Sequence, residues 1–361
     1  MKKKVLFIAS HRKESAPAQR FRFEQYFDFL KHNGFECSLS PLIESPEDHK
    51  IFYGPNPVLK VIAGIKMGFR RVRDLLHKQE YDIIFIAREA FMTGTTYFER
   101  AFKKSRAKLV YDFDDAIWID VISEKNKTFA WLKNGEKTKK IIRLCDLIIA
   151  GNEYLAQYAR PYNPRVVIIP TTIDTDLYTP RYSLHDEPIV IGWSGSKSTI
   201  DHFKTAIPAL SVLKKKYGDR ITVRVIGDES YRHEALGIVG MPWKKETELD
   251  DLWPIDIGIM PLPDDEWTWG KCGLKGLQYM ALNIPTVMSP VGVNREILND
   301  GVNGFLASST SEWVAKISLL IDDGNLRVQI GKEGRKVVEK RFSVTSQKEN
   351  YLHAFRSLVP E

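Results

Sequence analysis

The sequence predicts an α/β protein built from two successive domains, each a parallel β-sheet covered by helices. Three observations lead to this fold class. Short apolar runs rich in Val and Ile alternate with longer amphipathic stretches, which is typical of parallel sheets packed against helices. The alternation begins again after the polar residues that precede Pro188. At 361 residues, the chain is also too long for one ordinary core.

In the first half, each strand is expected where a short Val- and Ile-rich run lies between polar segments. The runs are 5–9, 37–41, 83–87, 108–111, 147–150 and 166–169. Helices are expected where apolar residues recur with helical spacing, at 20–32, 59–78 and 125–143.

In the second half, the same criteria predict strands at 189–193, 222–226, 257–261, 286–289 and 304–307. Helices are expected at 199–217, 273–282, 294–299 and 311–322. Two such series imply two Rossmann-like domains with a cleft between them. Ligands of these sheets bind beyond the carboxyl ends of the strands.

The net charge of +7 is concentrated in the first half of the chain. Residues 1–180 hold 30 Lys and Arg against 22 Asp and Glu, and the remainder holds 23 against 24. Such a basic half suits an anionic substrate or an anionic membrane surface. No nucleic-acid-binding motif accompanies it, so nucleic acid is not an expected partner.

The cysteine and hydropathy patterns indicate a cytoplasmic protein. Three cysteines lie far apart in the sequence, which predicts neither disulfides nor a zinc site. The apolar run near the start is too short for a signal peptide, and no run is long enough to span a bilayer.

The first candidate site is the segment IVIGWSGSKST at 189–199. A buried strand runs into Gly195, Ser196 and Lys197 before the helix expected near Thr199. Glycine allows close approach of a ligand, and free N–H groups at a helix start favour phosphate. An ordinary strand-to-helix turn is the alternative interpretation.

The second candidate site lies in the segment 261–292, where a strand is followed by a polar loop and a helix. Lys271 and Lys275 are four residues apart, so both are expected on one helix face at its start, beside a bound anion. Gln278 is expected to face the same ligand. The alternative is a pair of solvated lysines.

The order of these segments resembles the retaining GT-B glycosyltransferases of family 4, the "group 1" transferases. The matching pieces are VVIIPTTID, the glycine loop, VRVIGD, DIGIMPL, YMALNIPTVMSPVG and EILNDGVNGFLA. Their joint order and spacing, from 166 to 307, carry the resemblance. It implies an N-terminal acceptor domain at 1–180 and a donor domain at 181–344. A final helix, about 345–361, would return to the first domain.

The resemblance also implies roles for individual residues. Trp243 would form a wall of the site for the donor's base. Gln278 falls where the family has the second glutamate of its EX7E pattern, which binds the ribose. The first glutamate would fall at Gly270, and Glu266 is the nearest acid. The usual phosphate-binding arginine and lysine are replaced by Ser196 and Asp201, so Lys271, Lys275 and Lys197 would neutralise the diphosphate.

Three carboxylates follow a buried strand in YDFDDAIW, at 111–118. Asp114 and Asp115 are candidates to orient the acceptor or contact the transferred sugar. Asp112 and Asp114 also match the DxD metal motif of the other transferase fold, GT-A, which predicts Mn²⁺ or Mg²⁺. A third interpretation is that the acids cap a helix N-terminus or pair with Arg88.

Basic residues in the first half supply candidates for acceptor binding. Arg20 and Arg22 follow the first strand and would bind an anionic acceptor, unless the loop is simply solvated. The 59–78 helix combines apolar and basic residues, and we expect one of its faces to pack on the sheet. Contact with an anionic membrane is the alternative.

The predicted function is therefore metal-independent, retaining transfer of a sugar from a UDP- or GDP-linked donor to an acceptor hydroxyl. No cofactor is expected. The acceptor is expected to be anionic or lipid-linked, in the synthesis of a cell-surface polysaccharide or glycolipid. Two alternatives stay open: a degenerate protein that only binds a nucleotide sugar, and an epimerase of the same fold that needs no acceptor.

Overall fold

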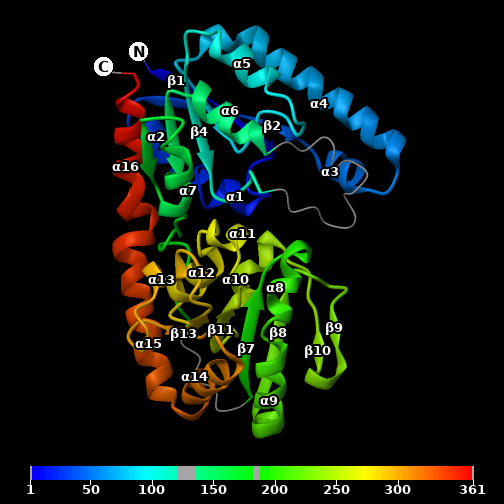
Figure 1. Ribbon diagram of the computed structural model, residues 1–361, viewed down its shortest axis with the longest axis vertical. Helices are drawn as coiled ribbons and strands as arrows, with labels where there is room; N and C mark the ends of the chain where they lie inside the picture. The colour runs from blue at the N-terminus through cyan, green and yellow to red at the C-terminus, as the bar shows by residue number, and fades with distance from the viewer. Residues whose placement is uncertain (1, 120–134, 182–187, 360–361) are drawn as a thin grey trace. The chain divides into compact units, whose positions relative to one another are not determined.

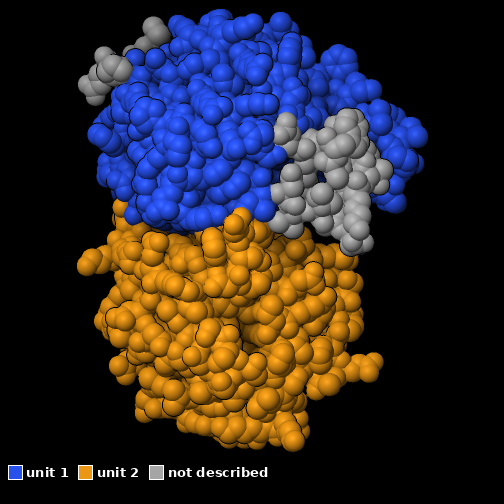
Figure 2. Space-filling view, in the orientation of Figure 1, with its two compact units in different colours: residues 1–171, 347–361 blue, residues 172–346 orange. Residues whose placement is uncertain are grey.

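A computed structural model describes residues 2–119, 135–181 and 188–359. The chain divides into two compact units, residues 1–171 with 347–361 and residues 172–346 (Figure 2). The division after Thr171 lies some residues before the boundary expected from the sequence at 180.

Unit 1 is built on a six-stranded sheet in which every neighbouring pair is parallel. The strand order is β2-β1-β3-β4-β5-β6 (Figure 1). All six predicted strands are confirmed, at β1 (Lys3–His11), β2 (Phe35–Ile43), β3 (Ile83–Ala87), β4 (Lys108–Phe113), β5 (Leu147–Ala150) and β6 (Val166–Ile168).

The helices of unit 1 differ more from the prediction. They are α1 (Pro17–Arg20), α2 (Phe27–His32), α3 (Pro46–Tyr53), α4 (Pro57–His77), α5 (Tyr97–Lys103), α6 (Glu136–Leu144), α7 (Glu153–Ala159) and α16 (Val344–Arg356). Of the helix expected at 125–143, residues 125–134 lie outside the described part of the chain. The continuous helix expected at 20–32 is wrong. Residues 19–24 are all buried in succession, which one face of a regular helix cannot achieve.

Aromatic side chains form much of the core of unit 1. Phe7 and Phe85, on adjacent strands, have ring centroids 4.8 Å apart, and Phe355 of α16 lies about 6 Å from each. Tyr351 of α16 stacks on Tyr26 at 4.3 Å. These contacts anchor the C-terminal helix to unit 1.

Unit 2 has a five-stranded parallel sheet in the order β13-β12-β11-β7-β8. The five predicted strands are confirmed, at β7 (Ile189–Ser194), β8 (Ile221–Ile226), β11 (Ile257–Met260), β12 (Thr286–Met288) and β13 (Phe305–Leu306). The sequence missed the small antiparallel hairpin of β9 (Arg232–His233) and β10 (Ile238–Val239). Strands of two residues carry too little alternation to be recognised.

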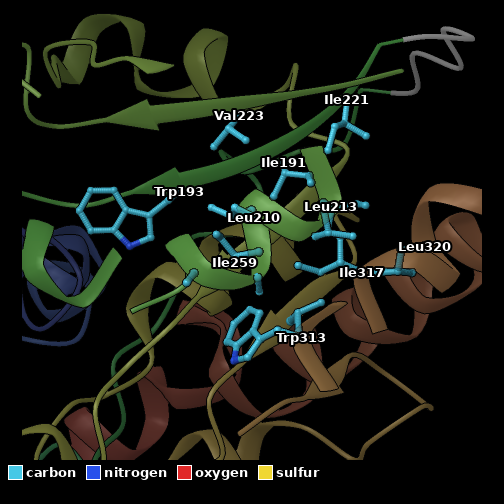
Figure 3. Packing of buried hydrophobic residues seen from close by; sticks show 14 of the residues in the cluster. Ile191, Trp193, Leu210, Leu213, Ile221, Val223, Ile259, Trp313, Ile317 and Leu320 are labelled. Carbon is cyan, nitrogen blue, oxygen red and sulfur yellow. The ribbon is translucent and has the colours of Figure 1, made fainter. Parts of the chain in front are cut away.

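The helices of unit 2 are α8 (Ile200–Lys204), α9 (Ile207–Tyr217), α10 (Glu248–Leu252), α11 (Glu266–Trp269), α12 (Leu274–Ala281), α13 (Asn294–Ile297), α14 (Thr310–Asp322) and α15 (Gly324–Val337). The helix expected at 199–217 is interrupted after Lys204. Pro208 has no N–H and its ring would clash with the carbonyl of Lys204, so the chain starts a second helix there. Figure 3 shows side chains of β7, β8, β11, α9 and α14 that meet in the core of this unit.

The prediction that one face of the 59–78 helix packs on the sheet is confirmed, because Ala63 and Met67 of α4 form a buried cluster with Leu42 and Ile43 of β2. The side of α4 that packs on unit 1 is formed by Ala63, Met67, Arg70, Arg71 and Asp74. Most of its large apolar side chains are exposed. Among the described residues, no helix is both long enough and apolar enough to cross a membrane.

Candidate functional site

The strand order marks one position on each sheet where a ligand is expected. In unit 2, β7 lies between β8 and β11. The chain passes from β7 to β8 on one side of it and then crosses over to β11 on the other side. In open parallel sheets, ligands bind at such a reversal, beyond the carboxyl ends of the strands. The loops that follow β7 and β11 are therefore the candidate site of unit 2.

Gly195, directly after β7, and Gly227, directly after β8, serve internal packing. A Cβ atom on Gly195 would lie 2.2 Å from the Trp193 indole, and one on Gly227 would lie 2.1 Å from the Gly195 carbonyl oxygen. The Ser196 N–H, expected to be free for phosphate, donates to Thr199 Oγ1 at 3.1 Å. Lys197 Nζ donates to Ser230 Oγ and lies 4.0 Å from Asp228. The loop after β7 therefore contributes to the shape of the site more than it provides hydrogen-bond donors for a phosphate.

The two lysines after β11 lie over tryptophan rings. Lys275 Nζ is 5.5 Å from the Trp193 ring centre, and Lys271 Nζ is 4.4 Å from that of Trp267. Both lysines are half-buried. Because α12 begins at Leu274, Lys271 precedes the helix, and the expectation that both share a helix face is wrong. Two half-buried cations nevertheless lie at the carboxyl edge of the sheet.

His202, on α8, belongs to the same region and was not predicted from the sequence. Its Nδ1 atom is buried and has no hydrogen-bond partner among the described residues. Burial, together with the nearby charges of Lys275 and Lys271, lowers the pKa of His202 to about 4. The ring is therefore neutral at pH 7. A lone histidine carries no sequence signal, so only the fold reveals it.

Gln278 does not face the lysines as expected but lies in a buried network. Its Nε2 donates to Glu248 Oε1 at 3.2 Å and to the Tyr178 hydroxyl at 3.1 Å. Glu248 also accepts from the Tyr178 hydroxyl at 2.8 Å and from Trp243 Nε1 at 3.0 Å. Gln278, Glu248 and Tyr178 are each less than a tenth exposed. Glu248 was missed because its partners are distant in sequence.

Trp243 and Glu266, the remaining candidates in unit 2, have different surroundings. Trp243 is half-buried, and its indole N–H points to Glu248. Glu266 is exposed in the first turn of α11, a helix capped by Asp265 and Thr268.

In unit 1, the strand order reverses between β1 and β3, which makes the residues after these strands the candidate site. Arg88 directly follows β3, and its backbone has a φ of 64°. Its Nη2 lies 2.7 Å from Asp114 Oδ1 and 2.6 Å from Asp115 Oδ2. Although burial opposes it, the two carboxylates raise the pKa of Arg88. The structure thus confirms the pairing with Arg88 and brings Asp114 and Asp115 to this edge.

His11, the last residue of β1, lies at the same edge. Burial, together with the electrostatic effects of His49, Arg88 and Arg12, lowers its pKa to about 4. The His11 ring is parallel to that of Tyr53, with 6.2 Å between the centroids. A neutral histidine, an arginine and two carboxylates therefore meet at the carboxyl ends of β1, β3 and β4.

Arg22, expected to bind an acceptor, is instead part of the interior of unit 1. Its exposed fraction is 1%, and its guanidinium donates to Asp112 at 2.5 Å and to the Ile169 carbonyl. The Tyr351 hydroxyl donates to the Arg22 carbonyl. We therefore assign Arg22 a structural role. Arg20 is also buried, and its guanidinium lies over the Phe21 ring.

The DxD interpretation requires Asp112 and Asp114 to share one metal ion. The two carboxylates are instead held by different arginines, Arg22 and Arg88. The described residues contain no cluster of three or more His, Cys, Asp or Glu side chains that could hold a metal.

Comparison with known proteins identifies the fold. A family model described as "Glycosyl transferases group 1" matches residues 179–337. No curated protein matches the sequence. HepE of Anabaena, crystallised with UDP and glucose, has a TM-score of 0.67 at 16% identity, over 98% of this chain and 100% of that one.

Two further structures match over nearly the full length. Sucrose-phosphate synthase of Thermosynechococcus elongatus has a TM-score of 0.68 at 14% identity, over 99% of both chains. A glycosyltransferase from Rickettsia africae has a TM-score of 0.66 at 15% identity, over 100% of this chain and 99% of that one. These are structures of the GT-B fold.

The buried network gives a prediction about Gln278. Gln278→Glu places a second carboxylate against Glu248, and we expect the free energy of unfolding to fall by about 1–3 kcal/mol. The exchange variant Glu248→Gln with Gln278→Glu restores one amide beside one carboxylate and should recover part of that loss. Urea unfolding followed by tryptophan fluorescence measures both, with Glu246→Gln as a control at an exposed carboxylate. Full stability of Gln278→Glu would contradict the network.

His202 gives a second prediction. We expect the ring to titrate near pH 4 in the free protein, and its pKa to rise when pyrophosphate binds, because a nearby anion favours the protonated form. Binding would then take up a proton, and the affinity would increase as the pH falls from the raised pKa of the complex towards about 4. NMR of the imidazole Cε1–H signal, assigned with His202→Asn, measures this. An unchanged pKa of His202 at saturating pyrophosphate would show that His202 is not part of the site. The exposed His77 of unit 1 is the internal control, whose signal should not respond to pyrophosphate.

Proposed function

We propose that the chain, whose residues 179–337 match the group 1 glycosyltransferase model, is a retaining transferase of the GT-B fold that uses a nucleotide sugar. Unit 2 would bind the donor and unit 1 the acceptor. The donor we propose is a UDP-sugar, since HepE, which shares the fold, was crystallised with UDP and with UDP-glucose. We place the reaction in the synthesis of a cell-surface polysaccharide or glycolipid, with an anionic or lipid-linked acceptor.

The observation that carries the donor assignment is the cluster of Lys271, Lys275 and His202 at the reversal of the unit 2 sheet. Two half-buried cations attract a diphosphate strongly because they are poorly screened by water. The neutral His202 ring offers Nδ1 or Nε2 as one more hydrogen-bonding group. Gly195, Ser196 and Lys197 would form the rim of this phosphate site.

The remaining donor contacts follow from the positions of Trp243 and Gln278. A half-buried indole whose N–H is fixed by Glu248 is suited to stack on a base. Gln278 would contribute to the ribose site through the network it holds, with Glu248 providing the carboxylate that the family has at the position of Gln278.

In the proposed reaction, the bond between the sugar C1 and the leaving phosphate oxygen breaks while a bond from C1 to the acceptor oxygen forms on the same face. The acceptor proton passes to an oxygen of the leaving diphosphate. Lys271 and Lys275 stabilise the charge that develops there, and such stabilisation is often the largest catalytic contribution. Neither a dedicated base nor a metal ion is required.

On the acceptor side, we propose that Asp114 and Asp115 orient the acceptor hydroxyl. Their bonds to Arg88 hold both carboxylates in place, which limits the entropy lost when the acceptor binds. Glu266, exposed on α11, is available to a sugar hydroxyl. Arg20 stays a candidate for an anionic acceptor, whereas Arg22 does not.

Removal of one phosphate-binding charge tests the donor site. Lys275→Ala should weaken binding of UDP by about 1.5–3 kcal/mol, the range for a hydrogen bond to a charged group. Lys271→Ala should also weaken binding. Lys204→Ala is the matched control, because Lys204 is exposed and paired with Asp201 on neighbouring α8. Calorimetry that finds the same UDP affinity in all three variants and the native chain would refute the assignment.

The reaction itself is tested by the release of UDP from radiolabelled UDP-sugars. We expect release only when an acceptor from a panel of anionic and lipid-linked glycans is present, and no effect of EDTA. UDP-sugar consumed without any acceptor would favour an epimerase or a hydrolase. Activity lost with EDTA and restored by Mn²⁺ would refute metal independence, and preference for GDP-sugars would refute the choice of base.

A further inference from the structure

Helix α4 exposes a regular apolar stripe on the surface of unit 1. Six side chains spaced alternately four and three residues apart face outward, which places them in one line along the helix. Their exposed fractions run from 45% to 77%. The α4 stripe consists of Val58, Ile62, Ile65, Phe69, Val72 and Leu76.

The opposite side of α4 carries Arg70, Arg71 and Asp74 beside Ala63 and Met67, and its charges are neutralised within unit 1. Arg70 pairs with Asp48 at 2.8 Å and with Glu44 at 3.0 Å. Arg71 is completely buried and binds Asp74 and the Ala9 carbonyl. The helix is therefore oriented opposite to an ordinary surface helix, whose apolar side faces the core. This orientation leaves a large apolar surface in water, which marks an interaction site.

Cationic side chains border the stripe. Lys66 and Arg73 have side chains that are 57% and 60% exposed, although Lys66 Nζ also lies 2.8 Å from Asp48 and Arg73 Nη2 lies 3.7 Å from Glu44. The only acid within α4 is Asp74, which is buried. The exposed surface of the helix is thus apolar with a basic border and carries no carboxylate of its own.

We propose that α4 docks on an anionic phospholipid bilayer, with the stripe in the acyl–headgroup boundary and Lys66 and Arg73 at the phosphates. Apolar side chains on one face and long basic side chains beside them are what an interfacial helix requires. A second copy of this chain fits less well, because pairing two α4 stripes would bring the basic borders of both helices together. The excess of 30 basic over 22 acidic residues in 1–180 adds long-range attraction to such a surface.

This inference is independent of the proposed reaction, because it concerns where unit 1 binds and not what is transferred. A chain with no transferase activity on any tested acceptor would still be expected to bind anionic vesicles.

The test is co-sedimentation of the full chain with vesicles of phosphatidylglycerol mixed with phosphatidylcholine, and with vesicles of phosphatidylcholine alone. We expect binding to the anionic vesicles, weakened by salt because ions screen charges beyond a Debye length of about 10 Å at 0.1 M. Ile65→Ser with Phe69→Ser should weaken binding at least about tenfold, since both side chains leave water on docking. Lys66→Gln with Arg73→Gln should weaken vesicle binding less than the Ile65 and Phe69 variant does. The effect of removing these two charges should be larger at low salt than at high salt.

Leu319→Ser is the matched control, because Leu319 is a 52% exposed apolar residue on a helix of unit 2. Circular dichroism and thermal unfolding establish that each variant is folded. Three results would overturn the proposal: no binding to anionic vesicles, equal binding to neutral ones, or native binding by the Ile65 and Phe69 variant. A dimer in sedimentation velocity that this variant dissociates, without vesicle binding, would assign the stripe to a second copy instead.

Discussion

Parallel pairing of every strand within each main sheet is the constraint on which the chemistry of this protein depends. It sends all strand carboxyl ends to one edge of the sheet, so loops far apart in sequence meet there. In unit 2, this brings the segment after β7 together with Lys271 and Lys275, which follow β11. In unit 1, it brings His11 to Arg88 and the two aspartates. Without that edge, none of these residues would form a site.

The two edges differ in charge. The edge of unit 2 gathers two lysines over tryptophan rings beside a histidine that burial keeps neutral. The edge of unit 1 places one arginine between two carboxylates, beside a neutral His11 and the charge of Arg12. The first suits a diphosphate and the second suits hydroxyl groups of a sugar. This difference agrees with a donor on unit 2 and an acceptor on unit 1.

Two buried networks show how polar groups inside the units are satisfied. Arg22 and Asp112 neutralise each other in unit 1, and α16 closes over them through Tyr351. In unit 2, Glu248 accepts hydrogen bonds from Trp243, Tyr178 and Gln278. An amide at position 278 suits this arrangement, because a glutamate there would face the Glu248 carboxylate. The departure from the family pattern at this position therefore has a local electrostatic reason.

The sequence by itself determined the strands of both main sheets, because runs of Val and Ile between polar segments have few other stable conformations. It also determined that the lysines after β11 and the acids after β4 lie beyond strand ends.

Only the tertiary structure decided which polar residues are available to a ligand. Arg22 and Arg20 share the composition of a binding loop, yet both are buried. His202 and Glu248 belong to no sequence motif, since the residues that surround them in the fold are distant in sequence. The orientation of α4 was also undetermined, because an amphipathic pattern defines two faces but not which one meets the protein. Burial of Arg70 and Arg71 depends on the acids and carbonyls that unit 1 places against them.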